Sequence, residues 1–429
     1  MNNFLILPHQ LFESKYLNKK KKIIIWEHPN YFTKYNFNKK KLILHRASMK
    51  YYEDYLKKKK FKVEYVEFDE SFNYKNLEFF DPIDKLKIKG KMIESPNFIL
   101  TKKDHELYRK KTTKFMFNNF YIWSKNLKDI HPELRSMDKM NRQVFKGNEK
   151  IPKLPNNKSD KKFIDEAIKY VETNFPNNYG NTDNFIYPIS HKNAKKWLKD
   201  FIKKRFENFG PYQDFVKKDN IFMFHSILSS SINIGLLNPS EIIKEINKVK
   251  GKVAANSFEG YLRQLFWREY QRLTYNYIDF FKHDYFGNKK KLNKKWYNGT
   301  LGIPPIDDLI KTGFNTGYMH HIGRLMYMGN FMNIYGLSPK EGFKWFMEFS
   351  VDSYEWVMCQ NVLDMVFFCT GGMTMRKPYV SKTNYILKNS EYKKGPWCDK
   401  WNNLYDNFLR KNKDKLWKFR YNFPTLKKL

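Results

Sequence analysis

The period of the hydrophobic pattern changes once along this chain, and the change limits the folds open to it. In the first 125 residues, Lys22–Trp26 is a short β-branched run, and Phe61–Phe68 alternates apolar and polar residues as a half-buried strand does. Leu42–Tyr55, between them, has helical spacing. Strands that alternate with helices predict a parallel sheet with helices on its faces. From Phe163 onward the apolar residues recur with the helical period, which predicts an all-α region.

A polar stretch interrupted by prolines separates the two patterns. Residues 126–162 include Pro152 and Pro155, and this composition is typical of a linker. The chain has 429 residues, which is long for one hydrophobic core. We therefore predict a Rossmann-like α/β domain over residues 1–125, a linker over 126–162 and a large all-α domain over 163–429. No Gly-x-Gly-x-x-Gly motif follows the first strand, so the chain lacks that dinucleotide-binding fingerprint.

Shorter patterns predict the remaining elements. Phe4–Leu7 is an apolar run stopped by Pro8, and Leu77–Phe80 and Phe98–Leu100 are candidates for two further strands. Helical spacing, with Ser, Asn or Pro near several starts, predicts the helices of the last two thirds. These are Phe163–Asn174, Asn193–Phe209, Pro239–Val249, Ser257–Phe280, Pro305–Tyr335 and Pro339–Val351.

The net charge of +36 predicts a polyanionic partner such as DNA or RNA, with binding that weakens steeply as salt rises. The alternative is a solvated, lysine-rich surface. The runs Lys19–Lys22 and Lys57–Lys60 favour this alternative, because they adjoin hydrophobic patterns and contain no interleaved aromatic residues.

Cysteine usage and the amino terminus indicate a soluble, intracellular protein. Cys359, Cys369 and Cys398 fit neither a disulfide framework nor a Cys-x-x-Cys metal site. Met1–Pro8 lacks the basic and apolar regions of a signal peptide, and no apolar run approaches the thickness of a bilayer. We expect a protein of the cytoplasm or of a compartment that contains DNA, neither secreted nor bound to a membrane.

One segment, Thr316–Met326, combines two adjacent histidines with an arginine in an apolar helical pattern. Residues three apart share a helix face, so His321 and Arg324 can present a proton donor and a cation to one pocket. A buried arginine needs an anionic or hydrogen-bonding partner. The alternative is ordinary, since a single histidine on an apolar helix is more often a core residue than a catalyst.

Three other segments mix aromatic, charged and small residues in a similar way: Phe224–Leu237, Phe258–Tyr270 and Trp345–Met358. The serines of the first suit a phosphate group but also an ordinary helix cap. In the second, Gln264 and Arg268 share a helix face. Trp267 either forms the bottom of a pocket for a flat base or belongs to the core. In the third, Asp352 is either an acceptor among aromatic rings or a capping carboxylate.

Taken together, these segments resemble the photolyase/cryptochrome family, in the same order and across the whole helical region. The stretches similar to the most recognisable family motifs are Trp296–Pro304, Thr316–Arg324 and Gln264–Tyr270. The branch that includes bacterial (6-4) photolyases with an iron–sulfur cluster is the most similar. Its marks here are Pro8–Leu11, His45–Met49, Asn233–Leu237, Tyr354–Val357, Asn361, Met365, Gly371–Gly372, Lys377–Tyr379 and Asn384–Ile386.

The resemblance implies that the helical domain holds FAD. The cofactor-binding residues implied are Ser226, Leu228, Ser229, Asn233, Gln264, Arg268, Tyr318, His321, Arg324, Asp352 and Met358. Met358 falls at the position that faces flavin N5. The catalytic residues implied are His321 as proton donor to the lesion, Trp267 as the ring on which a lesion base stacks, and Trp345 as an electron relay. Phe346 beside it is a poor relay.

The chain departs from this branch at its metal cluster. The branch uses four cysteines, whereas the matching positions here are Pro305, Lys393, Pro396 and about Asp399, with Cys398 one residue away. Because cluster ligation needs thiolates, we expect no iron–sulfur cluster and no other metal. The resemblance also allows an antenna chromophore of the lumazine or flavin type in the amino-terminal domain.

The function implied is that of a DNA photolyase, a carbon–carbon lyase that uses light and electron transfer from reduced FAD to repair UV-induced pyrimidine dimers. His321 favours (6-4) photoproducts over cyclobutane dimers. UV-damaged DNA would be the partner of a monomeric protein, gripped by Arg376, Lys377 and Lys382 beside Trp267.

Two alternatives stay open at this point. A cryptochrome-type blue-light photoreceptor would bind the same flavin without repairing DNA, and Met358 and Phe346 argue for it. A basic nucleic-acid-binding scaffold without a cofactor would be colourless.

Overall fold

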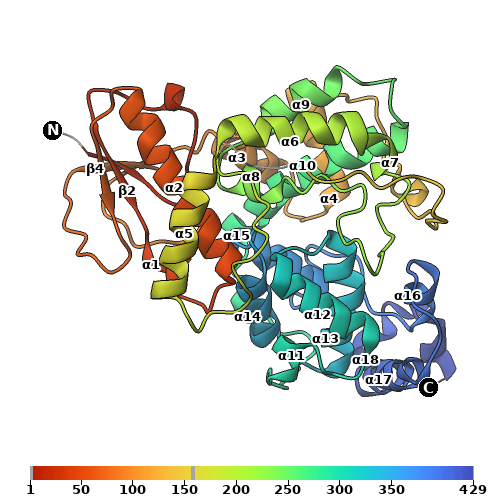
Figure 1. Ribbon diagram of the computed structural model, residues 1–429. Coiled ribbons are helices and arrows are strands. Elements are labelled where there is room, and N and C mark those ends of the chain that lie inside the picture. The colour runs from red at the N-terminus through yellow and green to blue at the C-terminus, as the bar shows by residue number, and fades with distance from the viewer. Residues whose placement is uncertain (1–2, 156–159, 429) are drawn as a thin grey trace.

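The computed structural model describes residues 3–155 and 160–428, and its amino-terminal part is a five-stranded parallel sheet (Figure 1). The strands are β1 (Asn3–Ile6), β2 (Lys22–Trp26), β3 (Val63–Val66), β4 (Leu77–Phe80) and β5 (Lys91–Ile93). They lie in the order β3-β2-β1-β4-β5, and every neighbouring pair is parallel. The predicted parallel α/β domain is confirmed. The strand expected at Phe98–Leu100 is wrong, because that segment is irregular and the short, largely exposed β5 takes the sheet edge.

The two faces of the sheet bury different sets of side chains, as the alternation of a strand requires. Ile23 and Ile25 of β2 belong to the main core, whereas Ile24 joins a separate small cluster on the other face. The elements between β2 and β3 are α1 (Pro29–Phe32) and α2 (Lys39–Lys58), and η1 (Ser14–Tyr16) precedes β2. The predicted helix at Leu42–Tyr55 is therefore confirmed as part of α2.

The remainder of the described chain is helical and forms two groups of helices (Figure 1). The upper group in the figure contains α3 (Lys102–Lys111), α4 (Phe117–Lys128), α6 (His191–Lys204), α7 (Phe206–Phe209), α8 (Ser229–Asn233), α9 (Pro239–Asn247) and α10 (Ala255–Tyr277). The lower group contains α11 (Lys295–Asn298), α12 (Pro304–Thr316), α13 (Asn330–Tyr335), α14 (Pro339–Phe349), α16 (Asn384–Lys388), α17 (Pro396–Lys411) and α18 (Lys413–Trp417). The all-α prediction for this region is confirmed.

Several short elements complete the helical region. Two π-helical stretches are η5 (Gly323–Gly329) and η6 (Cys359–Val366), the second preceded by α15 (Glu355–Met358). The 3-10 turns are η2 (Asp138–Met140), η4 (Phe280–Lys282), η7 (Arg420–Asn422) and η8 (Pro424–Lys428). Of the helices in the described residues, none combines the length and apolar character needed to cross a bilayer.

The single helix predicted over Pro305–Tyr335 is wrong. α12 ends at Thr316, and Gly317 then adopts a left-handed conformation with φ of 69°. This conformation terminates a helix and favours glycine, since it strains residues with a Cβ atom. A Cβ at Gly317 would also lie 2.6 Å from the Cγ1 atom of Val351. The chain becomes helical again only at His321, so the break delivers the histidine pair to a helix start.

The chain passes back and forth between the sheet and the helical groups. α4 packs against α10, whereas α5 (Lys161–Asn174), which follows the predicted linker, returns to pack against α2 (Figure 1). Residues 156–159 of that linker lie outside the described residues. The domain boundaries at residues 125 and 162 stay a prediction.

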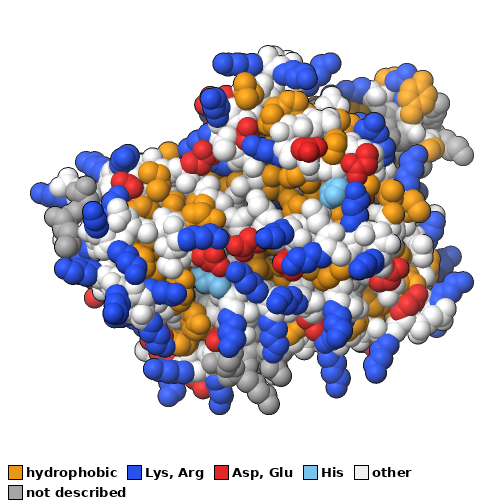
Figure 2. Space-filling view, turned by 90° about the horizontal axis from the view of Figure 1, so that it is seen from above, with side chains coloured by type: hydrophobic (Ala, Val, Ile, Leu, Met, Phe, Trp, Pro, Cys, Tyr) orange, Lys and Arg blue, Asp and Glu red, His pale blue; other side chains and the backbone are white. Residues whose placement is uncertain are grey.

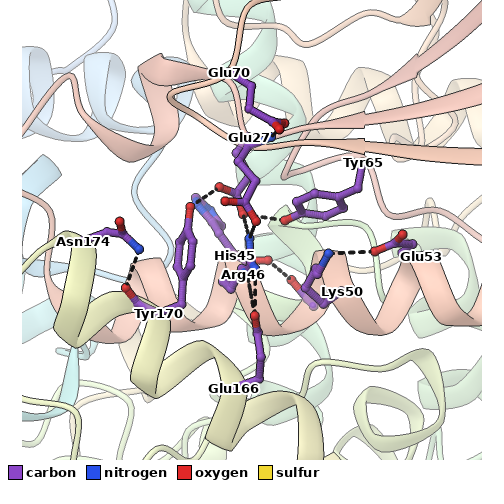
Figure 3. A network of polar contacts seen from close by, with 12 residues as sticks. Glu27, His45, Arg46, Lys50, Glu53, Tyr65, Glu70, Glu166, Tyr170 and Asn174 are labelled. Atoms are coloured by element: carbon purple, nitrogen blue, oxygen red, sulfur yellow. Dashed lines mark hydrogen bonds and ion pairs between the residues drawn. The ribbon is translucent and has the colours of Figure 1, made fainter.

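A buried ion network holds α5 to α2 and to the carboxyl end of β2 (Figure 3). Arg46 of α2 donates hydrogen bonds to Glu27, Glu67 and Glu166, and its side chain is only 6% exposed. Tyr170 of α5 also donates to Glu27, with a separation of 2.7 Å. Burial raises the pKa of Glu27 above its usual value, and Arg46 opposes that rise. The network therefore depends on the arginine for charge balance.

Replacing the buried cation should destabilise the protein far more than replacing a neighbouring surface cation. Arg46→Met leaves the buried Glu27 without its cation, and such a loss costs about 3–5 kcal/mol. Lys50→Met, one turn further along α2, breaks a partly exposed pair with Glu53 and should cost about 0–1 kcal/mol. Urea unfolding followed by circular dichroism measures both losses. Equal losses in the two variants would contradict the role given to Arg46.

Candidate functional site

A cavity lies between the two groups of helices. α8 and α10 line one side, and η5, α15 and the Asp352 loop line the other. Its empty space, which includes open solvent at the mouth, is about 1140 Å³. All eleven residues that the sequence proposed for cofactor binding line this inner cavity. They are Ser226, Leu228, Ser229, Asn233, Gln264, Arg268, Tyr318, His321, Arg324, Asp352 and Met358.

A bidentate ion pair stands on the cavity wall. Arg324 donates to the two carboxylate oxygens of Asp352 at 2.9 and 3.2 Å, and both side chains are largely buried. Arg324 also donates through Nε to the Met319 carbonyl at 2.6 Å, which fixes the guanidinium plane. Burial by itself raises the pKa of Asp352, but Arg324 and the Ser350 hydroxyl outweigh it and hold the pKa below its usual value. The pair is therefore charged and rigid at neutral pH.

A chain of hydrogen bonds joins this pair to α10. Asn233 donates through Nδ2 to the backbone carbonyl of Asp352 at 3.0 Å and accepts from Arg268 Nε at 3.2 Å. Arg268 donates further to the Asn97 carbonyl at 2.7 Å. Burial lowers the pKa of Arg268 to about 10, so its side chain remains a cation at neutral pH. The cavity thus has two fixed cations, Arg268 and Arg324, and one carboxylate.

Two stacked histidines face the same cavity without partners. The rings of His225 and His320 lie 4.4 Å apart, and both residues are buried. Nε2 of His225 and both ring nitrogens of His320 find no hydrogen-bond partner among the described residues. Burial lowers the pKa of His225 to about 4 and that of His320 well below its usual value, so both rings are neutral. Buried polar atoms are rarely left unpaired, so these nitrogens fit a cavity that holds a polar ligand.

Sequence reasoning missed the role of this pair. His225 stood in a segment interpreted only for its serines, and His320 only as the neighbour of His321. Nothing in their spacing, 95 positions apart, indicates that the rings stack. The orphaned nitrogens appear only when the fold brings the two segments together.

A second cavity adjoins the first, and we call the first the inner cavity and the second the outer cavity. Its empty space is about 1380 Å³, again including the mouth. Gln264, Trp267 and His321 line both cavities and therefore stand at the boundary between them. Arg142, Arg263 and Arg376 line only the outer one, together with Asp138, Asp214 and Tyr379. Arg142 pairs with Asp138 and Asp214, and Arg263 pairs with Asp138, so Arg376 is the lining arginine of the outer cavity without such a pair among the described residues.

His321 is neutral at this boundary. His321 is solvent-accessible because it borders both cavities, while their walls remove part of its hydration. This partial desolvation, followed by the charges of Arg324 and Arg263, lowers the pKa of His321 to about 4, and Asp138 acts in the opposite direction. The ring therefore presents one N–H donor and one acceptor at neutral pH.

Trp267, the other boundary residue, is fixed in orientation. Its Nε1 donates to Asn361 Oδ1 at 3.0 Å, and the ring of Phe117 packs edge-on against it at 4.6 Å. The half-buried indole keeps an accessible part in both cavities. It can serve as a flat wall for a planar group.

The remaining predicted residues lie elsewhere. Trp345 is fully buried and packs against Phe349, whose ring lies 5.3 Å from the Arg324 guanidinium. It therefore stands one ring behind the cavity wall. Lys382 pairs with Asp406 at 2.9 Å, and neither Lys382 nor Lys377 lines either of the two cavities. The catalytic and DNA-binding roles of these residues stay predictions.

Positive charge is not confined to the outer cavity. Figure 2 shows Lys and Arg side chains scattered over the whole visible face, with hydrophobic and a few acidic side chains between them. This distribution gives a general attraction for polyanions and indicates no single sequence-reading surface.

The cysteines of the described residues are unpaired and are not grouped with other potential metal ligands. Cys359, Cys369 and Cys398 are all buried and free. Across residues 3–155 and 160–428, no three His, Cys, Asp or Glu side chains form a group that could hold a metal ion. The absence of an iron–sulfur cluster stays a prediction from the sequence.

Family comparisons match both parts of the chain. Residues 4–81 and 78–187 match the family described as deoxyribodipyrimidine photo-lyase-related protein. Residues 261–418 match the FAD binding domain of DNA photolyase. The second match includes nearly all of α10, η5 and the Asp352 loop, and hence most of the inner cavity.

Individual relatives match parts of the chain, and one of them is a named photolyase. A (6-4) photolyase of Agrobacterium fabrum is 34% identical over 299 residues, which are 66% of this chain and 58% of that protein. The chain thus aligns with less than two thirds of the length of this relative. An uncharacterised protein of Acanthamoeba polyphaga mimivirus is 52% identical over 91 residues, which are 21% of this chain and 74% of that protein.

Solved structures support the fold. A class III photolyase from Agrobacterium tumefaciens superposes with a TM-score of 0.58 at 14% identity, covering 96% of this chain and 86% of that one. A cryptochrome from Synechocystis superposes equally well, at 13% identity, with 97% and 89% covered. The sequence matches to both parts of the chain show that it belongs to the photolyase/cryptochrome family.

Proposed function

We propose that the protein is a light-driven DNA repair enzyme that binds FAD in the inner cavity and splits UV-induced pyrimidine dimers, with (6-4) photoproducts as the preferred lesion. The observation that carries this proposal is the pair Arg324–Asp352 on the wall of a cavity that also contains unpaired histidine nitrogens. The match to the FAD-binding domain and the (6-4) photolyase relative support it.

The residues around the inner cavity fit FAD. A dinucleotide offers anionic phosphates and a flat ring with donors and acceptors. Arg268 supplies a fixed cation, and the orphaned nitrogens of His225 and His320 supply hydrogen bonds that are otherwise lost. The Arg324–Asp352 pair offers both signs of charge to a ring edge, and Met358 offers an apolar contact.

Bound and reduced, FAD would supply the light-excited electron that breaks the bond between the damaged bases. The protein need only position the partners and exclude side reactions. A lesion flipped out of the duplex would enter the outer cavity, at a cost of a few kcal/mol that is smaller for damaged bases. Trp267 gives it a flat wall, while Arg142, Arg263 and Arg376 attract the phosphates.

His321 is the residue through which the site can move a proton. It lies between the cavities, so one face meets the cofactor and the other meets the lesion. Near pH 7 it is neutral, because partial desolvation and two arginines lower its pKa. Phosphates bound near Arg263 would neutralise one of those cations and raise the pKa of His321, since a nearby negative charge favours the protonated ring. DNA binding would thereby favour the protonated His321 ring, which can donate a proton to the lesion.

A cryptochrome-type photoreceptor is the second candidate. Met358 lines the cavity without offering a polar group, and Phe346 adjoins Trp345, where it would hinder an electron relay. Light-induced changes in flavin absorbance without turnover of either lesion would favour this candidate over repair.

Removing the carboxylate of the central pair should weaken flavin retention. Asp352→Asn leaves the buried Arg324 without its charge partner. Such a loss costs about 3–5 kcal/mol of stability, and here that loss falls on the wall of the cavity. We expect the FAD content after gel filtration to fall at least tenfold. Asp406→Asn breaks a partly buried pair with Lys382, neither residue of which lines the cavity, and should retain wild-type content. The same FAD content in both variants would contradict the proposed location.

Repair of (6-4) photoproducts should depend on His321. His321→Gln is expected to lower that repair by about 10²–10⁴-fold, the usual contribution of a general acid, with FAD retained. His131→Gln, at a surface contact with Asn247, is the control and should keep full activity. The assay uses reduced protein, blue light and oligonucleotides with either lesion. Wild-type protein that leaves both lesions intact would refute repair.

The pKa of His321 should respond to Arg263. Because Arg263 lowers that pKa and shields Asp138, which raises it, Arg263→Gln is expected to move the pKa of His321 upward from about 4. Arg410→Gln, on the surface of α17, should leave the value unchanged. Titration of the histidine ring by NMR in flavin-free protein measures both. A fall in the pKa, or no movement, would contradict the electrostatic account of the boundary.

A further inference from the structure

The crevice where an open parallel sheet usually binds its ligand is filled here by the chain itself. Such crevices lie beyond the carboxyl ends of the strands, at the point where the strand order reverses. The order β3-β2-β1-β4-β5 puts that point between β1 and β4. His9 and Asp84 follow these strands, and both are buried. His9 Nε2 lies 3.0 Å from the Pro82 carbonyl and ties the two loops together.

The segment that fills the crevice comes from the helical region. The backbone N–H of Trp356 donates to Asp84 Oδ1 at 2.9 Å, and the Tyr354 hydroxyl lies 2.9 Å from His45 Nε2. Lys41 of α2 donates to the carbonyl of Ser353. Three groups of the α/β domain thus bind three residues, 353, 354 and 356, of one short segment.

This segment is a direct continuation of the inner cavity wall. Asp352 precedes it, and Val357 and Met358 follow it, and all three line the cavity. The hydrogen bonds to Ser353 and Trp356 involve the backbone, so they fix the path of the chain between Asp352 and Met358. A shift of that path would move Asp352 and Met358 relative to a flat ring bound in the cavity.

The two charged residues of this contact have no other evident task. The Lys41 side chain is fully buried, and Asp84 is 7% exposed. Neither forms an ion pair within the part of the chain that the structure describes. The Lys41 ammonium lies 4.5 Å from the Phe37 ring centre and 4.9 Å from that of Tyr354, and Tyr31 donates a hydrogen bond to Asp84. Burial lowers the pKa of Lys41 to about 7 and raises that of Asp84 to about 7. Such groups are costly to bury, so stability alone gives no reason to have them here.

We propose that Lys41 and Asp84 are positioning residues of the flavin site, and that the α/β domain uses its switch-point crevice to hold residues 353–356 and thereby sets the spacing of Asp352 and Met358 across the inner cavity. The inference rests on the proposed flavin in that cavity. It assigns the amino-terminal domain a part in the flavin site that does not require an antenna chromophore.

Lys40 provides a matched control. It adjoins Lys41 on α2, is equally buried and also donates through Nζ, but to Asn181 and Asp183 rather than to the 353–356 segment. Lys40→Met and Lys41→Met therefore remove the same charge, and Lys40→Met removes three hydrogen bonds whereas Lys41→Met removes one. Arg46→Met is a second control, because it destabilises α2 without touching the segment.

The experiment compares the FAD complexes of wild type, Lys41→Met, Asp84→Leu, Asp84→Asn and the two controls. The FAD dissociation rate, the visible circular dichroism of the flavin and its midpoint potential are measured beside urea unfolding. Lys41→Met and Asp84→Leu should release FAD at least tenfold faster and alter the dichroism, since each loses a hydrogen bond of a charged group. Asp84→Asn keeps an acceptor for Trp356 and should restore wild-type values.

Several results would overturn the inference. Wild-type release and spectra in Lys41→Met and Asp84→Leu would do so, and so would equal changes in Lys40→Met or Arg46→Met, which would show a general loss of stability. If Lys41→Met does not fold, Tyr354→Phe removes one hydroxyl from the same contact and should alter the dichroism in the same direction. Wild-type protein that binds no FAD would instead contradict the proposed function.

Discussion

The buried ion pair between Arg324 and Asp352 is the interaction on which the rest of the site depends. The two residues come from separate segments, η5 and the loop after α14, and their pairing holds these segments on one side of the cavity. Desolvation makes such a pair costly unless every group is satisfied. The Met319 carbonyl accepts from Arg324, the Ser350 hydroxyl donates to the Asp352 carboxylate, and Asn233 donates to the backbone carbonyl of Asp352.

The pair in turn relies on parts of the protein that are distant in sequence. Asn233 connects it to α8 and, through Arg268, to α10. The α/β domain supports the segment after Asp352 through Lys41, His45 and Asp84. The inner cavity is thus built at the meeting point of three regions, and no one of them could fold into it alone.

The sequence predicted the sheet well because β-branched runs and period-two alternation report burial directly. It missed β5, because the Lys91–Ile93 run is only three residues long and largely exposed, and it pairs with β4 at the sheet edge. It also joined α12 to the following helix, because apolar periodicity does not reveal that Gly317 turns left-handed. The residues around the cavity were found through family resemblance, whereas the stacking of His225 on His320 is a tertiary contact that no local pattern encodes.

Identification of the molecule that the purified protein holds tests the central claim most directly. The visible absorption spectrum of the folded protein, followed by denaturation and mass analysis of what is released, gives that identity in one experiment. The account predicts a flavin spectrum and release of FAD in about equal amount to the protein. A colourless protein that neither releases FAD nor takes it up when FAD is added would contradict it.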